Sequence, residues 1–259
     1  MKHVPRKRFG QHFLHDASVI KRILDAIAPT PEQHLVEIGP GLGALTLPLL
    51  MRIPILDAIE IDRDAIRDLR SKTTEQSLRI HEADVLKFDI ATLRQDSRRL
   101  RLVGNLPYNI STPLLFQLIA QRQHIEDMHF MLQKEVVDRM AAEPNTEAYG
   151  RLTVMLAPWV QVESLFDVGR GAFRPPPKVT SSIARLIPHA IPPFVIQDQD
   201  IFARVVSAAF SQRRKTLRNA IKTLIPEEAI IRAGIDPGVR GETLSPAQFA
   251  ALAAQYSPA

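Results

Sequence analysis

The sequence predicts an α/β protein: a mainly parallel sheet with helices on both faces, followed by a small all-helical domain. Two observations predict this arrangement. Between residues 34 and 142, short apolar runs with β-forming residues alternate with segments of helical periodicity, which is typical of a parallel sheet. From about residue 190 onward, only helical patterns occur. We therefore expect a sheet domain over residues 1–188 and a helical domain over residues 189–259.

The expected elements of the sheet domain follow one another in a regular order. Asp16 is a good N-cap for a first helix, which Pro29 closes. Strands are then expected over residues 34–38, 55–61, 78–83, 100–104 and 128–132. Helices are expected over residues 42–50, 63–71, 113–121 and 135–142. Two further runs, 160–167 and 181–187, fit antiparallel strands that complete such a sheet.

A change in proline usage marks the end of this domain. Six of the 20 prolines lie between Pro175 and Pro193, which indicates a linker. Beyond it, helices are expected over residues 201–212, 215–224, 227–233 and 246–256.

Composition excludes several classes of protein. Of the 259 residues, 45% are hydrophobic and 24% are charged, as in soluble globular proteins. Cysteine is absent, which excludes disulfides, cysteine-bound metals and a thiolate nucleophile and favours a cytoplasmic protein. No run approaches the ~20 apolar residues of a membrane helix. Neither a phosphate-binding loop nor a hydrolase or zinc-protease motif occurs, and we expect no metal.

The positive charge is concentrated in two short segments. The net charge is +5, from 33 basic and 28 acidic residues. Residues 1–10 and 210–222 contain no acid, and their basic residues are Lys2, Arg6, Lys7, Arg8, Arg213, Arg214, Lys215, Arg218 and Lys222. Such segregation suits a polyanion such as nucleic acid, although charge runs alone are also typical of solvated surfaces.

A glycine-rich turn after the first expected strand indicates a nucleotide-like ligand. The run Gly39-Pro40-Gly41-Leu42-Gly43 lets the backbone approach a ligand closely. About 20 residues later, Glu60 ends the next strand, where a carboxylate can accept hydrogen bonds from both ribose hydroxyls. Together these features predict an adenosine-containing cofactor. They leave open which one, since a nicotinamide-dependent dehydrogenase also fits, as does an ordinary structural turn.

The run Asn105-Leu106-Pro107-Tyr108 distinguishes between these alternatives, because it is typical of enzymes that methylate exocyclic amines of nucleobases. The N6 lone pair of adenine is delocalised into the ring and is therefore a poor nucleophile. The Asn105 side-chain oxygen and the Leu106 carbonyl can accept the two N6 hydrogens, which directs the lone pair toward a methyl group. Pro107 fixes the loop, and Tyr108 offers a ring on which the base can stack.

Over essentially its whole length, the chain resembles the bacterial small-subunit rRNA adenine dimethyltransferases, the KsgA or RsmA family. Besides the two motifs above, the resemblance rests on the segments at residues 8–14, 83–85, 131–137, 173–181 and 212–216. It implies a Rossmann-like class I methyltransferase sheet, S-adenosylmethionine as donor, and N6,N6-dimethyladenosine made on two adjacent adenosines of the 3′-terminal hairpin of the small-subunit rRNA.

The resemblance also implies roles for individual residues. Those expected to bind the donor are Gln11, His12, Leu14, Gly39, Gly41, Glu60, Asp84, Val85 and Asn105. His12 departs from the family, which has asparagine at this position. Phe173 is expected to hold the target adenine opposite Tyr108. The expected contacts to rRNA phosphates are Arg6, Lys7, Arg8, Arg213, Arg214, Lys215, Arg218 and Lys222.

Further expectations are that the helical domain docks rRNA of the precursor small subunit and that the protein is a monomer with a role in subunit biogenesis. Three alternatives are a large-subunit rRNA methyltransferase, a DNA adenine-N6 methyltransferase, and a ribosome-assembly factor for which methylation is incidental.

Overall fold

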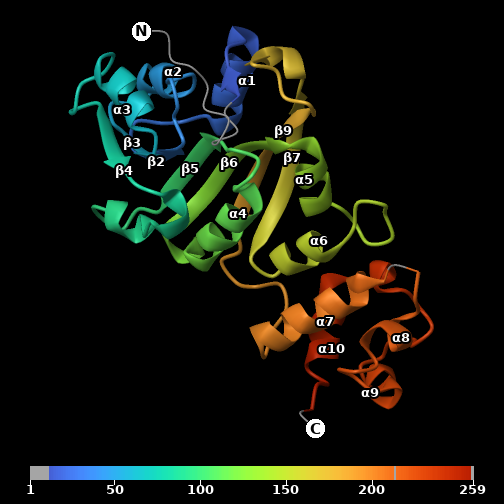
Figure 1. Ribbon diagram of the computed structural model, residues 1–259. Coiled ribbons are helices and arrows are strands. Elements are labelled where there is room, and N and C mark those ends of the chain that lie inside the picture. Colours follow the sequence, from blue (N-terminus) through green and yellow to red (C-terminus); the bar gives the residue numbers. More distant parts are fainter. Residues whose placement is uncertain (1–11, 213, 258–259) are drawn as a thin grey trace. The chain divides into compact units, whose positions relative to one another are not determined.

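The structure is a computed structural model that describes residues 12–212 and 214–257 (Figure 1). Its contacts divide the chain into two compact units. The sheet unit contains the described residues up to Val137 together with Val162–Pro188, and the helical unit contains Asp138–Gln161 and the described residues from His189 onward. This division differs from the single boundary expected at residue 189. The segment 138–161 belongs to the helical unit because its apolar side chains share that unit's core.

A seven-stranded sheet forms the centre of the sheet unit, in the order β4-β3-β2-β5-β6-β9-β7. Its strands are β2 His34–Ile38, β3 Leu56–Glu60, β4 Leu78–Glu82, β5 Leu100–Asn105, β6 Ile125–Gln133, β7 Val160–Val168 and β9 Ser181–Pro188. The pairs from β4 to β6 are parallel, and β9 is antiparallel to β6. The predicted mainly parallel sheet with an antiparallel addition is thus confirmed.

The helices of this region largely match those expected from the sequence. They are α1 Ala17–Ile27, α2 Thr46–Leu50, α3 Arg63–Arg70, α4 Ser111–Ala120 and α5 Lys134–Met140. The short 3₁₀ helices are η2 Val85–Lys87, η3 Ile90–Leu93, η4 Arg122–His124 and η5 Arg170–Ala172. As predicted, the Asp16 carboxylate caps α1, where it accepts hydrogen bonds from the backbone N–H groups of Ser18 and Val19. Helix α2 begins four residues later than expected, because the glycine turn extends into this segment.

One small ladder was not expected from the sequence. Strand β1 (Phe13–Leu14) pairs antiparallel with β8 (Phe173–Arg174), so that Leu14 lies opposite Phe173. The N–H of His15 extends the ladder with a hydrogen bond of 2.9 Å to the carbonyl oxygen of Ala172. A two-residue strand has too few residues to show an alternating pattern, and for this reason the sequence gives no signal for it.

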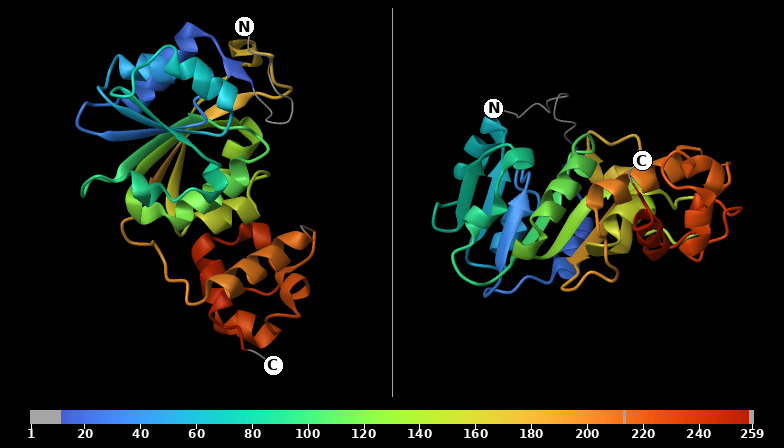
Figure 2. Two further views of the ribbon diagram at one scale, coloured as in Figure 1. Left: turned by 60° about the vertical axis from the view of Figure 1, so that its left-hand side comes forward. Right: turned by 90° about the horizontal axis from the view of Figure 1, so that it is seen from below.

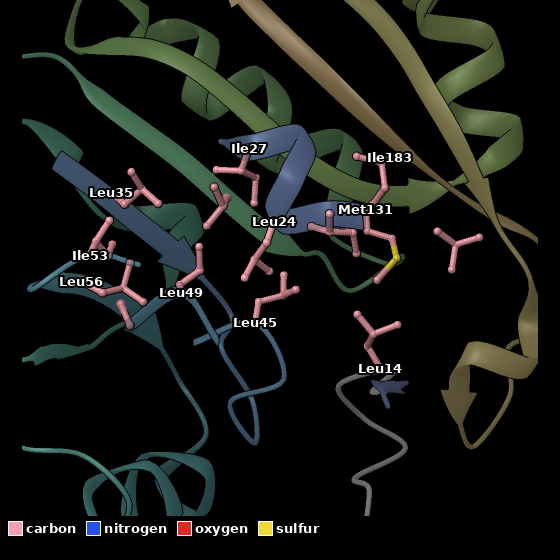
Figure 3. Close-up of a cluster of buried hydrophobic side chains, with 14 of the residues drawn as sticks. Leu14, Leu24, Ile27, Leu35, Leu45, Leu49, Ile53, Leu56, Met131 and Ile183 are labelled. Atoms are coloured by element: carbon pink, nitrogen blue, oxygen red, sulfur yellow. The ribbon is translucent and has the colours of Figure 1, made fainter. Parts of the chain in front are cut away.

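Helices cover the two faces of the sheet. Leu24 and Ile27 of α1 pack on one face with Leu35 of β2 and Met131 of β6 (Figure 3). Helix α4 covers the opposite face (Figure 2), and its buried side chains Leu114, Leu115, Leu118 and Ile119 are not part of that cluster. Residues that alternate along each strand therefore enter different cores, as expected for a sheet covered on both sides.

The helical unit has its own hydrophobic core. Its helices are α6 Arg151–Leu156, α7 Gln199–Ser211, α8 Leu217–Ile221, α9 Glu227–Arg232, the 3₁₀ helix η6 Gly241–Thr243 and α10 Pro246–Ala253. Phe202, Ile221 and Phe249 are buried at its centre with Tyr149, whose hydroxyl donates to the carbonyl oxygen of Leu244 at 2.6 Å. The sequence did not predict α6. In the part of the chain that the structure describes, no helix is long and apolar enough to cross a membrane.

A buried carboxylate links three strands of the sheet and should make stability depend on pH. Asp57 of β3 accepts hydrogen bonds from Nε2 of His34 at 2.8 Å and from Nε2 of His81 at 2.7 Å. Burial alone raises the pKa of Asp57, but the two histidine bonds outweigh it and lower the pKa to about 2. Because the folded value lies below the unfolded one, this stabilisation is complete above about pH 4 and disappears toward pH 2.

We therefore expect Asp57→Asn to lower the free energy of unfolding at pH 5 by about 2 kcal/mol more than at pH 2. Urea denaturation of both proteins across this pH range measures the difference. A gap between the two proteins that is the same at both ends of the range would contradict the role given to the carboxylate.

Candidate active site

A cavity of about 470 Å³ opens at the carboxyl ends of the central strands of the sheet unit. It is lined by residues 12–15, Glu37, residues 39–45, Leu47, Glu60, Ile61 and residues 105–110. In the sheet, β3 lies on one side of β2 and β5 lies on the other. The direction in which successive strands are added to the sheet therefore reverses between β2 and β5. Ligands of open α/β sheets bind in the crevice at such a reversal.

Gly39 forms the part of the cavity wall that directly follows β2. Its φ of +66° lies in the left-handed region, which glycine adopts without steric cost. A Cβ built on Gly39 would meet no atom within 4 Å, because the position faces the open cavity. The turn therefore presents bare backbone to whatever occupies this space.

Gly104 brings the Asn-Leu-Pro-Tyr run of residues 105–108, called the acceptor loop below, close to this turn. A Cβ at Gly104 would lie 2.5 Å from the carbonyl oxygen of Ile38, a contact that no side chain can make. Only glycine therefore allows β5 to approach the end of β2 at this point. As a result Asn105, the last residue of β5, lines the same cavity as Gly39.

Glu60 ends β3 at the rim of the cavity, where three backbone N–H groups hold its carboxylate. One oxygen accepts from Ile61 at 2.8 Å and Asp62 at 2.9 Å, and the other accepts from Gly41 at 3.1 Å. Burial raises the pKa of Glu60, and these hydrogen bonds work against that rise. The carboxylate is thus held in a fixed position at the rim of the cavity.

Glu37 is a second carboxyl group on the cavity, and the sequence analysis gave it no role. Its Oε2 accepts a hydrogen bond of 2.6 Å from the Thr46 hydroxyl. Burial, with a further contribution from the charge of Glu60, raises the pKa of Glu37 to about 8. At neutral pH the Glu37 carboxyl group is therefore mainly protonated. A carboxyl residue within the apolar run Leu35–Ile38, two residues before Gly39, was the signal that could have identified it.

The acceptor loop is held by contacts from three directions. The side-chain amide of Asn105 donates to the backbone oxygen of His12 at 3.1 Å, and the N–H of Leu106 donates to the carbonyl oxygen of Met131 at 3.2 Å. The Tyr108 hydroxyl forms a hydrogen bond of 2.7 Å with the hydroxyl of Ser181. Burial raises the pKa of Tyr108, so its phenol stays neutral. Hydrogen bonds therefore hold the loop in place at Asn105, Leu106 and Tyr108.

The structure brings most of the expected site residues together. Those that line the cavity are His12, Leu14, Gly39, Gly41, Glu60, Asn105, Leu106, Pro107 and Tyr108. Phe13 and Ile61 also line it, although the sequence analysis did not select them. Each is an apolar neighbour of a selected residue, and nothing in the sequence distinguishes it from a core residue.

Three expected residues, Asp84, Val85 and Phe173, do not line the cavity. Asp84 lies just beyond the end of β4, where its carboxylate accepts from the N–H of Leu86 and so caps η2, which begins at Val85. Phe173 is only 2% exposed and packs in the hydrophobic core through the β1–β8 ladder. The side chain of Phe173 is thus not positioned to stack on a base in this conformation.

The expected rRNA contacts are only partly described. Arg214, Lys215, Arg218 and Lys222 are exposed around α8 in the helical unit. Gln11, Arg6, Lys7, Arg8 and Arg213 lie outside the described residues. Among residues 12–212 and 214–257, no group of three histidine or acidic side chains is arranged to hold a metal ion.

Solved structures of RNA methyltransferases share this arrangement over nearly the whole chain. The 23S rRNA methyltransferase ErmE superimposes with a TM-score of 0.72 at 26% identity, covering 94% of this chain and 99% of ErmE. A dimethyladenosine transferase from Plasmodium falciparum gives a TM-score of 0.73 at 26% identity, covering 93% and 96%. The fold is therefore that of a Rossmann-like, S-adenosylmethionine-dependent methyltransferase, as the sequence predicted.

The family can be stated more narrowly. This chain belongs to the ribosomal RNA adenine dimethylase family, whose model matches residues 2–257. A relative from Methylococcus capsulatus, the "Ribosomal RNA small subunit methyltransferase A", is 56% identical over all 259 residues and is itself covered completely. The family resemblance that the motifs indicated is thereby confirmed.

Proposed function

We propose that this protein transfers methyl groups from S-adenosylmethionine to N6 of two adjacent adenosines in the 3′-terminal hairpin of small-subunit rRNA, giving N6,N6-dimethyladenosine. The observation that carries the proposal is that the glycine turn, Glu60 and the Asn-Leu-Pro-Tyr loop line one cavity. Donor and acceptor can therefore meet there. We place this reaction in the cytoplasm, on precursor small subunits, with the protein acting as a monomer.

The cavity fits the donor in size and chemistry. Its volume of about 470 Å³ lies within the usual range of ligand pockets, about 300 to 1,000 Å³. The open space over Gly39 suits the methionine portion, and the Glu60 carboxylate suits the ribose hydroxyls. When bound, the donor supplies a methyl group on a positively charged sulfur. Asp84, Val85 and Gln11 complete the proposed donor site by resemblance to the family.

The acceptor residues make N6 nucleophilic. The Asn105 Oδ1 and the Leu106 carbonyl oxygen accept the two N6 hydrogens, which localises the lone pair on nitrogen and directs it at the methyl group. The Tyr108 ring offers a face for the flipped base, and stacking of this kind contributes about 1 to 3 kcal/mol per base. After transfer, the cationic amine loses its proton to water, so no charged base is required. Stacking on Phe173 rests on the family resemblance alone.

The donor site is tested by enlarging Gly39. In Gly39→Val, the new side chain enters the cavity and the left-handed backbone becomes strained, so we expect at least a tenfold weaker Kd for S-adenosylhomocysteine, measured by calorimetry. Gly169→Ala is the matched control, since it also faces open space but has a φ of −65°. Unchanged affinity in Gly39→Val would place the donor elsewhere.

The helical unit is proposed to dock rRNA through the exposed basic residues around α8. We expect Arg214→Ala with Lys215→Ala to weaken binding to small subunits and to reduce the slope of log K against log salt by about 1 to 2. Lys21→Ala with Arg67→Ala removes the same charge from exposed positions of the sheet unit and serves as control. Equal slopes in both double variants would mean that the α8 residues contact no phosphate.

The proposed reaction is tested by methyl transfer from radiolabelled donor to small subunits that lack the modification, with the product nucleoside identified by mass. Free rRNA, large subunits and duplex DNA are run in parallel. We expect dimethyladenosine in the small subunit only. Transfer to large subunits or DNA would favour the corresponding alternatives, and binding without any transfer would favour an assembly factor.

The small subunit is favoured over the large one by the degree of similarity. The Methylococcus relative named for the small subunit is 56% identical, whereas ErmE, named for 23S rRNA, is 26% identical.

A further inference from the structure

His12 contacts two residues of the acceptor loop and one residue of the segment that follows β8. Its backbone oxygen accepts the hydrogen bond of 3.1 Å from the Asn105 amide, and its Nδ1 lies 2.8 Å from the carbonyl oxygen of Pro175. Its ring lies 5.7 Å from the ring of Tyr108, at an interplanar angle of 32°. One residue of the N-terminal segment thus connects the acceptor loop to the segment that follows β8.

The backbone contact determines which end of the Asn105 amide meets the target base. A primary amide has a nitrogen that only donates hydrogen bonds and an oxygen that only accepts them. Since Nδ2 of Asn105 is engaged by the His12 oxygen, Oδ1 is the end left for the N6 hydrogens. The opposite orientation would direct N–H groups at the N–H groups of the amine, and the Leu106 carbonyl would be the one acceptor left.

The imidazole holds His12 in the position from which its backbone oxygen accepts the hydrogen bond of Asn105. A carbonyl oxygen can only accept, so Nδ1 carries the hydrogen of the bond to Pro175, and this fixes the tautomer of the ring. The adjacent β1–β8 ladder holds residues 13 and 14, but its pairs end at Phe13, opposite Arg174. The bond from His12 to Pro175 therefore extends the ladder by one contact, through a side chain.

We propose that His12 is a positioning residue for methyl transfer: its imidazole, bound to Pro175, holds the residue 12 carbonyl that orients the Asn105 amide. This inference rests on the proposed function and adds a role beyond donor binding. It predicts that loss of the imidazole lowers kcat, because the amide then samples both orientations. Substrate affinity should change little, since Tyr108 and the basic residues are unaltered.

Two substitutions separate the imidazole's hydrogen bond from its other properties. In His12→Ala the bond to Pro175 is lost, and we expect kcat at saturating donor to fall about tenfold while KM for small subunits stays within twofold. In His12→Asn the side-chain nitrogen can occupy the place of Nδ1 and donate to the same carbonyl. We therefore expect kcat of this variant to return to within threefold of the wild-type value.

A double-mutant cycle tests the coupling to Asn105 directly. Asn105→Asp has two equivalent oxygens and no amide to orient, so adding His12→Ala should cause less than a twofold further loss. Losses that multiply would overturn the inference, as would a His12→Asn variant as slow as His12→Ala, or a change in KM that matches the change in kcat. Wild-type protein that transfers no methyl group to any RNA would instead overturn the proposed function.

A second readout does not depend on activity. In the donor-free protein, the side-chain amide hydrogens of Asn105 should exchange slowly with solvent, as followed by NMR with the signal assigned through Asn105→Asp. We expect exchange to become at least tenfold faster in His12→Ala and to remain slow in His12→Asn. Equal exchange rates in the wild type and His12→Ala would overturn the inference.

Discussion

Replacing Asn105 with alanine is expected to lower kcat for methyl transfer by at least about 100-fold, the usual scale for losing one fixed hydrogen-bonding group at a reacting centre. In the proposed reaction, the Asn105 oxygen is one of two acceptors for the N6 hydrogens, the other being the Leu106 carbonyl. With one acceptor, the lone pair stays conjugated with the ring during much of the approach to the methyl group. The lost interaction develops in the transition state, so KM should change far less than kcat.

Single-turnover methylation of small subunits, with binding measured in parallel, tests this expectation. Asn105 is half-buried on the cavity, so truncation leaves a small space and no unpaired charge. The His12 oxygen loses its donor but can bond to water that enters the cavity. Binding to small subunits should therefore be retained within about twofold. A parallel loss of binding would mean that Asn105 holds the RNA and has no part in the chemistry.

The location of this site could be predicted from the sequence because it follows from local patterns and one rule of topology. Gly39 and Asn105 each follow an apolar strand, and the carboxyl ends of parallel strands meet at one edge of the sheet. Gly104 allows the end of β5 to lie close to the end of β2, and this contact can be seen only in the structure. The chemistry could be predicted because few loops combine an amide, a proline and an aromatic ring after such a strand.

The remaining features depend on contacts between distant segments. Phe173 stands before three prolines, and the sequence does not show that it pairs with Leu14 and enters the core. Tyr149 reaches a carbonyl 95 residues away, which is why the segment around it belongs to the helical unit. The link from His12 to Pro175 spans 163 residues. Hydrophobic periodicity depends only on residues that are near one another in the sequence. It therefore cannot predict contacts between such distant segments.

Asp127→Asn is expected to destabilise the protein by about 3 to 5 kcal/mol, the usual cost of breaking a buried ion pair. Arg101 of β5 and Asp127 of β6 lie opposite each other on parallel strands and form two hydrogen bonds, of 2.8 and 2.9 Å. Their exposed fractions are 5% and 3%, so water cannot replace the lost partner. Arg101 also donates to the oxygens of Gln33 and Ile27, which hold the guanidinium in place after the substitution.

The groups around Asp127 do not replace its negative charge. His129 lies 3.8 Å from Asp127 and is neutral at pH 7, because burial lowers its pKa to about 4, so it neither adds to nor offsets the charge of Arg101. Arg185 places a second positive charge 3.3 Å from Asp127, so that removal of the carboxylate charge leaves two unneutralised cations near each other. The substitution therefore leaves buried Arg101 without a counterion, and urea denaturation at pH 7 measures the resulting loss of stability.

The same chemical change at an exposed ion pair provides the control. Asp25 bonds to Lys21 at 2.6 Å, but the two side chains are 47% and 74% exposed, so Asp25→Asn should destabilise the protein far less than Asp127→Asn. Both substitutions lie outside the cavity lining, and kcat at a temperature where each variant is folded should stay near the wild-type value. Equal destabilisation by the two substitutions would show that burial does not increase the cost of breaking the pair of Arg101 and Asp127. A much larger loss of stability in Asp127→Asn would show that this pair is needed to hold β5 against β6.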